Sequence, residues 1–283
     1  MSLGVNTNVA SLSVQKNLNN AANALQQSMT RLSSGLKINS AKDDAAGLQI
    51  ATRMSSQIRG QTVAIKNAND GISMAQTAEG ALQETTNILQ RMRELAVQAR
   101  NGTNGTADQT ATNAEFTQMS DELTRISQAT NLNGKNLLDG SAGSMTLQVG
   151  SNTGTANQIT LTLSSKFDAA SLSVGSGTTV LTGATSAAAG SAIDGAITAI
   201  DAALATVGAV RANLGAAQNR LTSTISNLQN VNENATAALG RVQDTDFAAE
   251  TAQLTKQQTL QQASTSVLAQ ANQLPSAVLK LLQ

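Results

Sequence analysis

The feature that most constrains the fold of this chain is an apolar residue that recurs every seven positions in its C-terminal third. The series is Ile193, Ile200, Val207, Leu214, Leu221, Leu228, Ala235 and Val242. Eight matched positions predict a single amphipathic helix, and a sustained period of seven predicts left-handed supercoiling against other helices. At about 1.5 Å per residue, such a helix would be roughly 75 Å long.

Other parts of the chain repeat the same period. Near the N-terminus the series is Leu18, Leu25 and Leu32, and after Asp244 it is Leu260, Val267, Leu274 and Leu281. A helix predicted over residues 45–100 carries the series Met54, Ala68, Ala75, Leu82, Leu89 and Ala96. A further helix is expected over residues 111–128, after a loop that is marked by Asn-Gly pairs.

Residues 140–190 show a different pattern. Met145, Leu147 and Val149 alternate with polar residues, as do Ile159, Leu161 and Leu163, and turn residues separate the two runs. This pattern predicts a β-hairpin. The nearly uncharged stretch 173–190 is low in complexity, and we expect it to form a surface loop. The predicted fold is mainly α, an elongated antiparallel coiled-coil rod of the N- and C-terminal segments with a small β-hairpin region at its distal end.

Composition narrows the possible functions. Eighteen basic and 18 acidic residues give a net charge of zero, which argues against a nucleic-acid partner. The chain has no cysteine and no histidine, which excludes disulfides, thiolate or imidazole metal sites and the commonest general base. Aromatic residues are 1% of the chain, so Ala, Leu, Ile and Val must fill its helical seams. We therefore expect no cofactor and no metal.

Targeting signals are also missing from the sequence. Residues 1–15 carry no Lys or Arg and no continuous apolar run, so no signal peptide is expected. We saw no stretch of about 18 apolar residues, so no membrane insertion is expected either.

The two ends of the chain are apolar along one stripe and uncharged over most of the rest. Residues 1–40 hold only Lys16, Arg31 and Lys37 as charges, and 247–283 hold only Glu250, Lys256 and Lys280. Such segments are weak helices on their own. They suit either a two-helix stem within the chain or burial among identical neighbouring chains, and the pattern alone leaves both open.

Long runs of sequence resemble one protein family. They are "VNTNVASLSVQKNL" (5–18), "RLSSGLKINSAKDDAAGLQIA" (31–51), "NANDGISMAQTAEGALQETTNILQRMRELAVQA" (67–99) and "ANQLPSAVLKLLQ" (271–283). They are similar to bacterial flagellin, the subunit of the flagellar filament, in a short form without large outer domains. The resemblance covers the segments before residue 140 and after residue 188, and the middle matches no family that we can name.

The resemblance implies a domain organisation and a set of partners. Residues 1–42 and 245–283 would form an inner terminal coiled-coil domain, and 43–244 a rod domain with a β-hairpin and loop region at about 140–190. The chain would leave the cell unfolded through the flagellar type III apparatus and polymerise outside it through non-closing contacts. Its expected partners are further copies of itself, an export chaperone, the filament cap and hook-associated proteins. The expected assembly seam comprises Leu18, Leu25, Leu32, Leu260, Val267, Leu274 and Leu281.

The resemblance also implies recognition by host receptors. The segment "QRMRELAVQ" (90–98) is similar to the part of flagellin that Toll-like receptor 5 recognises. The contacts that this implies are Gln90, Arg91, Arg93, Glu94, Leu95, Gln98 and, from the next helix, Glu115. Leu279, Leu281 and Leu282 are similar to the C-terminal leucines read by cytosolic inflammasome receptors.

The sequence gives less support to other functions. The nearest alternative is a hook–filament junction protein with flagellin-like ends, and a secreted adhesin is a more distant one. A protease-bearing flagellin conflicts with the absence of histidine. The Lys42-Asp43-Asp44 run has no context of a catalytic pocket, so we expect a turn and a subunit contact there. We therefore predict that the chain is not an enzyme.

Overall fold

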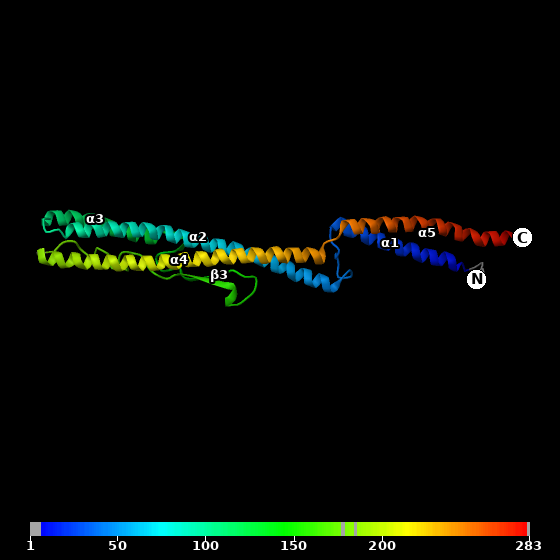
Figure 1. The fold of residues 1–283 in the computed structure, drawn as a ribbon, viewed down its shortest axis with the longest axis horizontal. Helices are drawn as coiled ribbons and strands as arrows, with labels where there is room; N and C mark the ends of the chain where they lie inside the picture. The colour runs from blue at the N-terminus through cyan, green and yellow to red at the C-terminus, as the bar shows by residue number, and fades with distance from the viewer. Residues whose placement is uncertain (1–6, 177–178, 184–185, 282–283) are drawn as a thin grey trace. The chain divides into compact units, whose positions relative to one another are not determined.

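A computed structural model describes residues 7–176, 179–183 and 186–281, without the side chains of 186–187 and 274–281. Its long helices are α1 (Val9–Ser34), α2 (Ala45–Ala99), α3 (Thr106–Ala129), α4 (Ser186–Gln243) and α5 (Phe247–Leu281), as Figure 1 shows. Each of the helices predicted from apolar periodicity is present, and α3 begins five residues before the expected position. The mainly helical fold is confirmed.

The strands lie between α3 and α4. They are β1 (Asn131–Leu132), β2 (Lys135–Asn136), β3 (Gly143–Gln148) and β4 (Gln158–Leu163), with the short 3-10 helix η1 (Thr155–Asn157) before β4. The antiparallel pairing of β3 with β4 sets Met145 opposite Leu161, which confirms the predicted hairpin. The turn from β1 to β2 has positive φ at Asn133 (51°) and Gly134 (76°), the geometry that favours Asn-Gly in two-residue hairpins.

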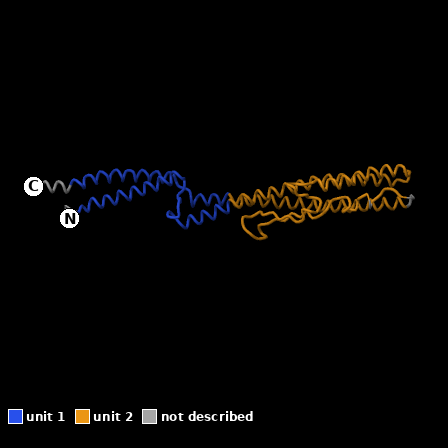
Figure 2. Tube along the Cα trace, turned by 180° about the vertical axis from the view of Figure 1, so that it is seen from behind, with its two compact units in different colours: residues 1–58, 233–283 blue, residues 59–232 orange. Residues whose placement is uncertain are grey.

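The chain divides into two compact units, coloured separately in Figure 2. Unit 1 comprises residues 1–58 and 233–283, and unit 2 comprises residues 59–232. The domain boundaries expected at 42/43 and 244/245 differ from the unit boundaries at 58/59 and 232/233, and fall in the segments that connect α1 to α2 and α4 to α5. Those boundaries stay a prediction about the assembled protein.

Unit 2 is organised by the antiparallel pairing of α2 with α4. The heptad residues Ile193, Ile200, Val207, Leu214, Leu221 and Leu228 of α4 are all buried. Arg93 pairs with Asp201 and Arg100 with Asp194, each at 2.8 Å, and Asn232 donates to the Thr62 hydroxyl at 3.3 Å. From one of these pairs to the next, the residue number rises along α2 by as many positions as it falls along α4. One register therefore holds along this part of unit 2.

The hairpin packs against the same two helices. Val149 and Ile159 form a small cluster with Ala68 of α2 and Leu221 of α4. A Cβ at Gly71 would overlap the Leu147 side chain, so glycine allows β3 to approach α2 closely. Asn67 donates its side-chain amide to the Gln148 carbonyl at 3.0 Å. The hairpin is thereby fixed to α2 by both packing and a hydrogen bond.

The low-complexity stretch differs from the expected surface loop. Within its described residues Val174, Thr179 and Leu181 are buried. The Leu181 backbone N–H donates to the Asn113 side chain of α3 at 2.8 Å. The prediction was wrong for these residues because sparse apolar side chains between Gly, Ser and Thr still gain free energy by burial, although they form no periodic pattern.

Helix α4 is also the most apolar part of the chain. Between Ala188 and Gln243 it contains an 18-residue window with a mean hydropathy of 1.5, long and apolar enough by composition to cross a membrane. Only 28% of that window is buried inside the structure, but the heptad residues Ile193, Ile200, Val207, Leu214, Leu221 and Leu228 are all buried in unit 2. Packing against α2 and the hairpin accounts for the apolar character of this series.

In unit 1, α1 and α5 lie side by side (Figure 1). Asn8 caps α1 through the Ser11 N–H and also donates to the Ala271 carbonyl of α5 at 2.8 Å. Gly35 ends α1 in the left-handed conformation, with φ of 72°. Backbone hydrogen bonds from Lys37 to Gln243 and from Thr245 to Gly35 then join the two connecting segments.

Candidate functional site

The seam between α1 and α5 is made of small residues more than of large ones. Its buried side chains are Ser11, Ala21, Ser28 and Ala271, and Leu18, Leu25 and Leu32 are half-buried beside them. From α5, Leu254 and Leu268 are half-buried in the same way. Small side chains let two helices approach closely but bury little apolar area, so this pair gains little stability from its own contacts.

Large apolar side chains are instead exposed on unit 1. Leu260 and Val267 of the expected assembly seam are 44% and 51% exposed. Others in unit 1 are Val9, Leu12, Met29, Ile50 and Phe247. We call these seven residues the exposed apolar set. These exposed side chains give unit 1 apolar surface that is available for contacts with other molecules.

The remaining expected seam and receptor residues at the C-terminus cannot be placed. The side chains of Leu274, Leu279 and Leu281 are outside the described part of α5, and Leu282 lies outside the described residues altogether. They stay predictions.

In unit 2, the expected receptor contacts come together on α2 and α3. Arg91 of α2 donates to Glu115 of α3 through Nε at 3.1 Å and Nη2 at 2.8 Å, and to Glu94 through Nη1 at 3.1 Å. The hydrogen bond with Glu115 raises the pKa of the Arg91 guanidinium above its ordinary value. Gln90, Arg93 and Gln98 are exposed on α2 as well. Arg91, Glu94 and Glu115 thus form one charged surface, which we call the Arg91–Glu115 surface, whereas Arg93 pairs with Asp201 of α4.

Leu95 is the exception among them. Its side chain is 1% exposed and belongs to the main hydrophobic core of unit 2. A direct contact through Leu95 would require α2 to move, so any effect of this residue must come through the packing that holds Arg91 and Glu94 in place.

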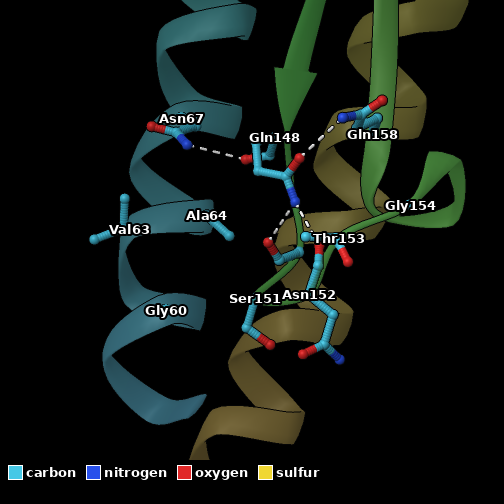
Figure 3. A pocket seen from close by; sticks show the side chains of 11 residues that line it. Gly60, Val63, Ala64, Asn67, Gln148, Ser151, Asn152, Thr153, Gly154 and Gln158 are labelled. Carbon is cyan, nitrogen blue, oxygen red and sulfur yellow. Dashed lines mark hydrogen bonds between the residues drawn. The ribbon is translucent and has the colours of Figure 1, made fainter. Parts of the chain in front are cut away.

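A hollow lies where the hairpin tip meets α2 (Figure 3). Its volume is about 450 Å³, and its lining includes Val63, Asn67 and the turn residues 150–154. Gln148 closes the turn by donating to the carbonyls of Gly150 and Asn152 at 2.9 and 2.8 Å. Because its lining residues carry no ionisable side chain, the hollow offers no acid–base chemistry.

A second hollow of about 620 Å³ lies in unit 1 between α1 and the segment that follows it. It includes Arg31, Lys42 and Asp43. Asp43 accepts hydrogen bonds from the backbone of Ser40 (3.0 Å) and Asn39 (3.2 Å), and the Ser40 bond lowers the pKa of its carboxyl. Asp44 caps α2 through the Gly47 N–H at 2.9 Å. Both carboxylates therefore shape the chain, as a turn requires.

The described part of the chain lacks one kind of chemical site, a cluster of metal-binding side chains. Among those residues, no three His, Cys, Asp or Glu side chains lie close enough to hold a metal ion. What the described surface offers is the exposed apolar set and the Arg91–Glu115 surface, both of which suit contacts with macromolecules.

Sequence reasoning missed one residue. Gln61 occupies the gap in the α2 heptad series between Met54 and Ala68, and its side chain is 3% exposed. Its Oε1 is buried without a hydrogen-bond partner. A gap in an otherwise regular apolar series was the signal that could have drawn attention to it.

Comparison with known proteins gives a consistent result. Residues 5–143 match the family described as the bacterial flagellin N-terminal helical region, and residues 197–282 match the bacterial flagellin C-terminal helical region. Flagellin B of Vibrio cholerae and Flagellin D of Vibrio anguillarum are each 40% identical to this chain, and each alignment covers 100% of both proteins. The alignments span 375 and 376 positions, so these relatives contain residues without a counterpart in the 283 here.

Solved structures include similar proteins. Bacillus cereus flagellin is 32% identical, with a TM-score of 0.47 over 58% of this chain and 88% of that one. A protein described as a flagellar hook-associated protein of Vibrio parahaemolyticus has a TM-score of 0.58 at 15% identity, over 71% of this chain and 100% of its own. At that identity the likeness concerns the fold alone. From the sequence matches, this chain belongs to the bacterial flagellin family, whose members are structural subunits of the flagellar filament.

Proposed function

We propose that copies of this chain polymerise into the filament by covering the exposed apolar set of unit 1. The observation that carries the proposal is the exposure of Leu260 and Val267 on α5 together with Leu12 and Met29 on α1. Burying one such side chain contributes about 1.5–3 kcal/mol. A few of these contacts in each subunit are enough to drive association.

The weak α1–α5 seam supports the same proposal. Small residues at its centre leave the pair with little apolar area to bury inside the chain. Neighbouring copies would supply the missing area, so assembly and the ordering of unit 1 would be coupled. A head-to-tail contact that does not close on itself produces a helical filament.

Seeded polymerisation tests this function. Purified chain mixed with short filament seeds should extend them in electron micrographs, whereas a chain lacking residues 247–283 should not. Full-length protein that stays monomeric beside seeds at high concentration would contradict the proposal. That outcome would favour the hook–filament junction alternative, which joins or caps and forms no long polymer.

We infer that the chain is exported unfolded through the flagellar type III apparatus, with an export chaperone, the filament cap and hook-associated proteins as its other partners. The absence of cysteine supports this, because no disulfide has to be reduced before the chain is threaded. Residues 1–60 fused to a reporter should direct its secretion. Secretion that continues in cells without the flagellar export gate would contradict the inference.

We also propose that the monomer binds Toll-like receptor 5 through the Arg91–Glu115 surface. The two ion pairs of Arg91 support this, because they hold its guanidinium in one position before a partner arrives. A chain lacking residues 247–283 should keep receptor activation, since α2 and α3 are intact. A reporter assay in which this monomer is silent would contradict the receptor assignment. Recognition of Leu279, Leu281 and Leu282 by inflammasome receptors is a separate proposal that rests on resemblance.

A further inference from the structure

The sequence contains three Asn-Gly pairs, at Asn101–Gly102, Asn104–Gly105 and Asn133–Gly134. Such a pair can modify itself, because the glycine nitrogen can attack the side-chain amide carbon of the preceding asparagine with no Cβ in the way. The reaction needs the nitrogen free to approach and the asparagine side chain free to turn. The structure places the three pairs in different surroundings.

Asn133 is held by its backbone. It lies in the two-residue turn of the β1–β2 hairpin, with φ of 51°, and Gly134 follows with φ of 76°. The pairing of Leu132 with Lys135 closes this turn. The rotation that would bring the Gly134 nitrogen to the Asn133 side chain requires the turn to open.

Asn104 is held at both reacting groups. Its Nδ2, the group that must leave, donates to the Gln98 carbonyl at 2.7 Å. The Gly105 nitrogen, the group that must attack, donates to Asp108 Oδ2 at 3.1 Å as α3 begins. Each hydrogen bond has to break before the two groups can meet.

Asn101 is held through its backbone, since its N–H donates to the Gln98 carbonyl at 3.2 Å and its carbonyl accepts from the Asn104 N–H at 3.0 Å, but in the described part of the chain neither of its two reacting nitrogens forms a hydrogen bond. Its Oδ1 accepts a hydrogen bond from the Thr103 N–H at 3.4 Å, and negative charge develops on this oxygen when its carbon is attacked. Gly102 is exposed, and an added Cβ there would meet no atom within 4 Å. Within the described part of the chain, no hydrogen bond involves the Gly102 N–H.

We propose that Asn101 is a site of spontaneous deamidation in the folded chain, and that Asn104 and Asn133 are protected by their hydrogen bonds and turn. The Gly102 nitrogen forms a bond to Asn101 Cγ and loses its proton, while the Cγ–Nδ2 bond breaks and ammonia leaves. Water then opens the resulting succinimide at either carbonyl. The products are aspartate and isoaspartate at position 101.

The change has a structural consequence at the end of α2. The new carboxylate would lie just beyond the C-terminus of this helix, where negative charge is unfavourable. It would also lie next to Arg100, whose Nε donates to Asp194 at 2.8 Å. Competition for this guanidinium would weaken one of the ion pairs between α2 and α4. The last turn of α2 should therefore fray in protein that carries aspartate or isoaspartate at position 101.

The test is peptide mapping by mass spectrometry after incubation of the folded full-length chain at mildly alkaline pH. The expected result is several-fold faster conversion of amide to acid at Asn101 than at Asn104 or Asn133, with an aspartate and isoaspartate doublet at 101. In urea the three rates should converge, because the protection belongs to the folded state. A folded chain that converts Asn104 or Asn133 as fast as Asn101 overturns the proposal.

Two variants test its physical basis. Gly102→Ala places a side chain in open space and should slow conversion at Asn101 several-fold, with Asn104 unchanged. Asp108→Ala frees the Gly105 nitrogen and should speed conversion at Asn104, with Asn101 unchanged. If Asp108→Ala leaves Asn104 as slow as before, the hydrogen bonds do not provide the protection and the proposal fails.

Discussion

Replacing Gln61 by leucine should stabilise unit 2. Gln61 lies in the heptad series that faces α4, is 3% exposed, and leaves its Oε1 buried without a partner. An unsatisfied buried acceptor costs about 1–3 kcal/mol. A leucine of similar size removes that cost and buries apolar area at this position.

We expect the free energy of unfolding of unit 2 to rise by about 1–2 kcal/mol. This is less than the full cost of the unsatisfied acceptor, because the leucine side chain must adopt a suitable rotamer. For a unit of this size, that gain should raise the unfolding midpoint by about 2–8 °C. Differential scanning calorimetry on the monomer measures the shift. Hydrogen exchange should locate it, with slower exchange near residue 61 of α2 and little change near residue 95.

Thr85→Val is the matched control. Thr85 is also buried on α2, but its hydroxyl donates to the Ala81 carbonyl at 3.0 Å. Because the Ala81 carbonyl still accepts the helical hydrogen bond from the Thr85 N–H, this change leaves no group unsatisfied and should cost no more than about 1.5 kcal/mol, with none of the gain expected at Gln61. If Gln61→Leu lowers the midpoint while Thr85→Val does not, the Gln61 oxygen is satisfied in solution and the reasoning about this position is wrong.

Other changes have defined outcomes. Leu95→Ala should lower the free energy of unfolding of unit 2 by about 2–5 kcal/mol in chemical denaturation, because the side chain is fully buried. Arg91→Ala should change stability by less than about 1 kcal/mol, since its ion pairs are exposed, yet weaken activation in a receptor reporter assay; unchanged activation would remove Arg91 from the contact. Asp43→Asn should lower the unfolding midpoint near neutral pH, and the difference from the parent should vanish in acid. The folded-state pKa of Asp43 is lowered, so its stabilisation is present above its unfolded pKa of about 3.9 and lost as pH falls through the folded value. A difference that persists in acid would contradict this.

The helices and the hairpin could be predicted because their signals are local and repeated. An apolar residue every seven positions fixes which face of α4 is buried, and Ile193 to Leu228 are buried as that pattern requires. The alternation of apolar and polar residues likewise indicates which face of β3 and β4 is buried. Gln61 was missed because a polar residue in a heptad position looks like an interruption, and only the packing shows that it lies inside.

Periodicity was less informative at the chain ends. The series with Leu260 and Val267 is the most apolar one on α5, yet both are exposed in the described chain. The face toward α1 instead mixes Leu254, Leu268 and Ala271 with Ser and Gln. Both faces repeat every seven residues, so a single sequence cannot tell which one meets the same chain and which one awaits another copy.

The central claim, that copies assemble through the exposed apolar set, is tested most directly by seeded growth of two single variants of α5. Val267→Glu places a charge on the proposed interface, and Gln258→Glu places the same charge at an exposed polar position of the same helix. Loss of one buried valine contact, worth at least about 1.5 kcal/mol, should raise the critical concentration of Val267→Glu at least about tenfold. Gln258→Glu should grow like the parent. Equal growth of both variants, with circular dichroism unchanged, would contradict the claim.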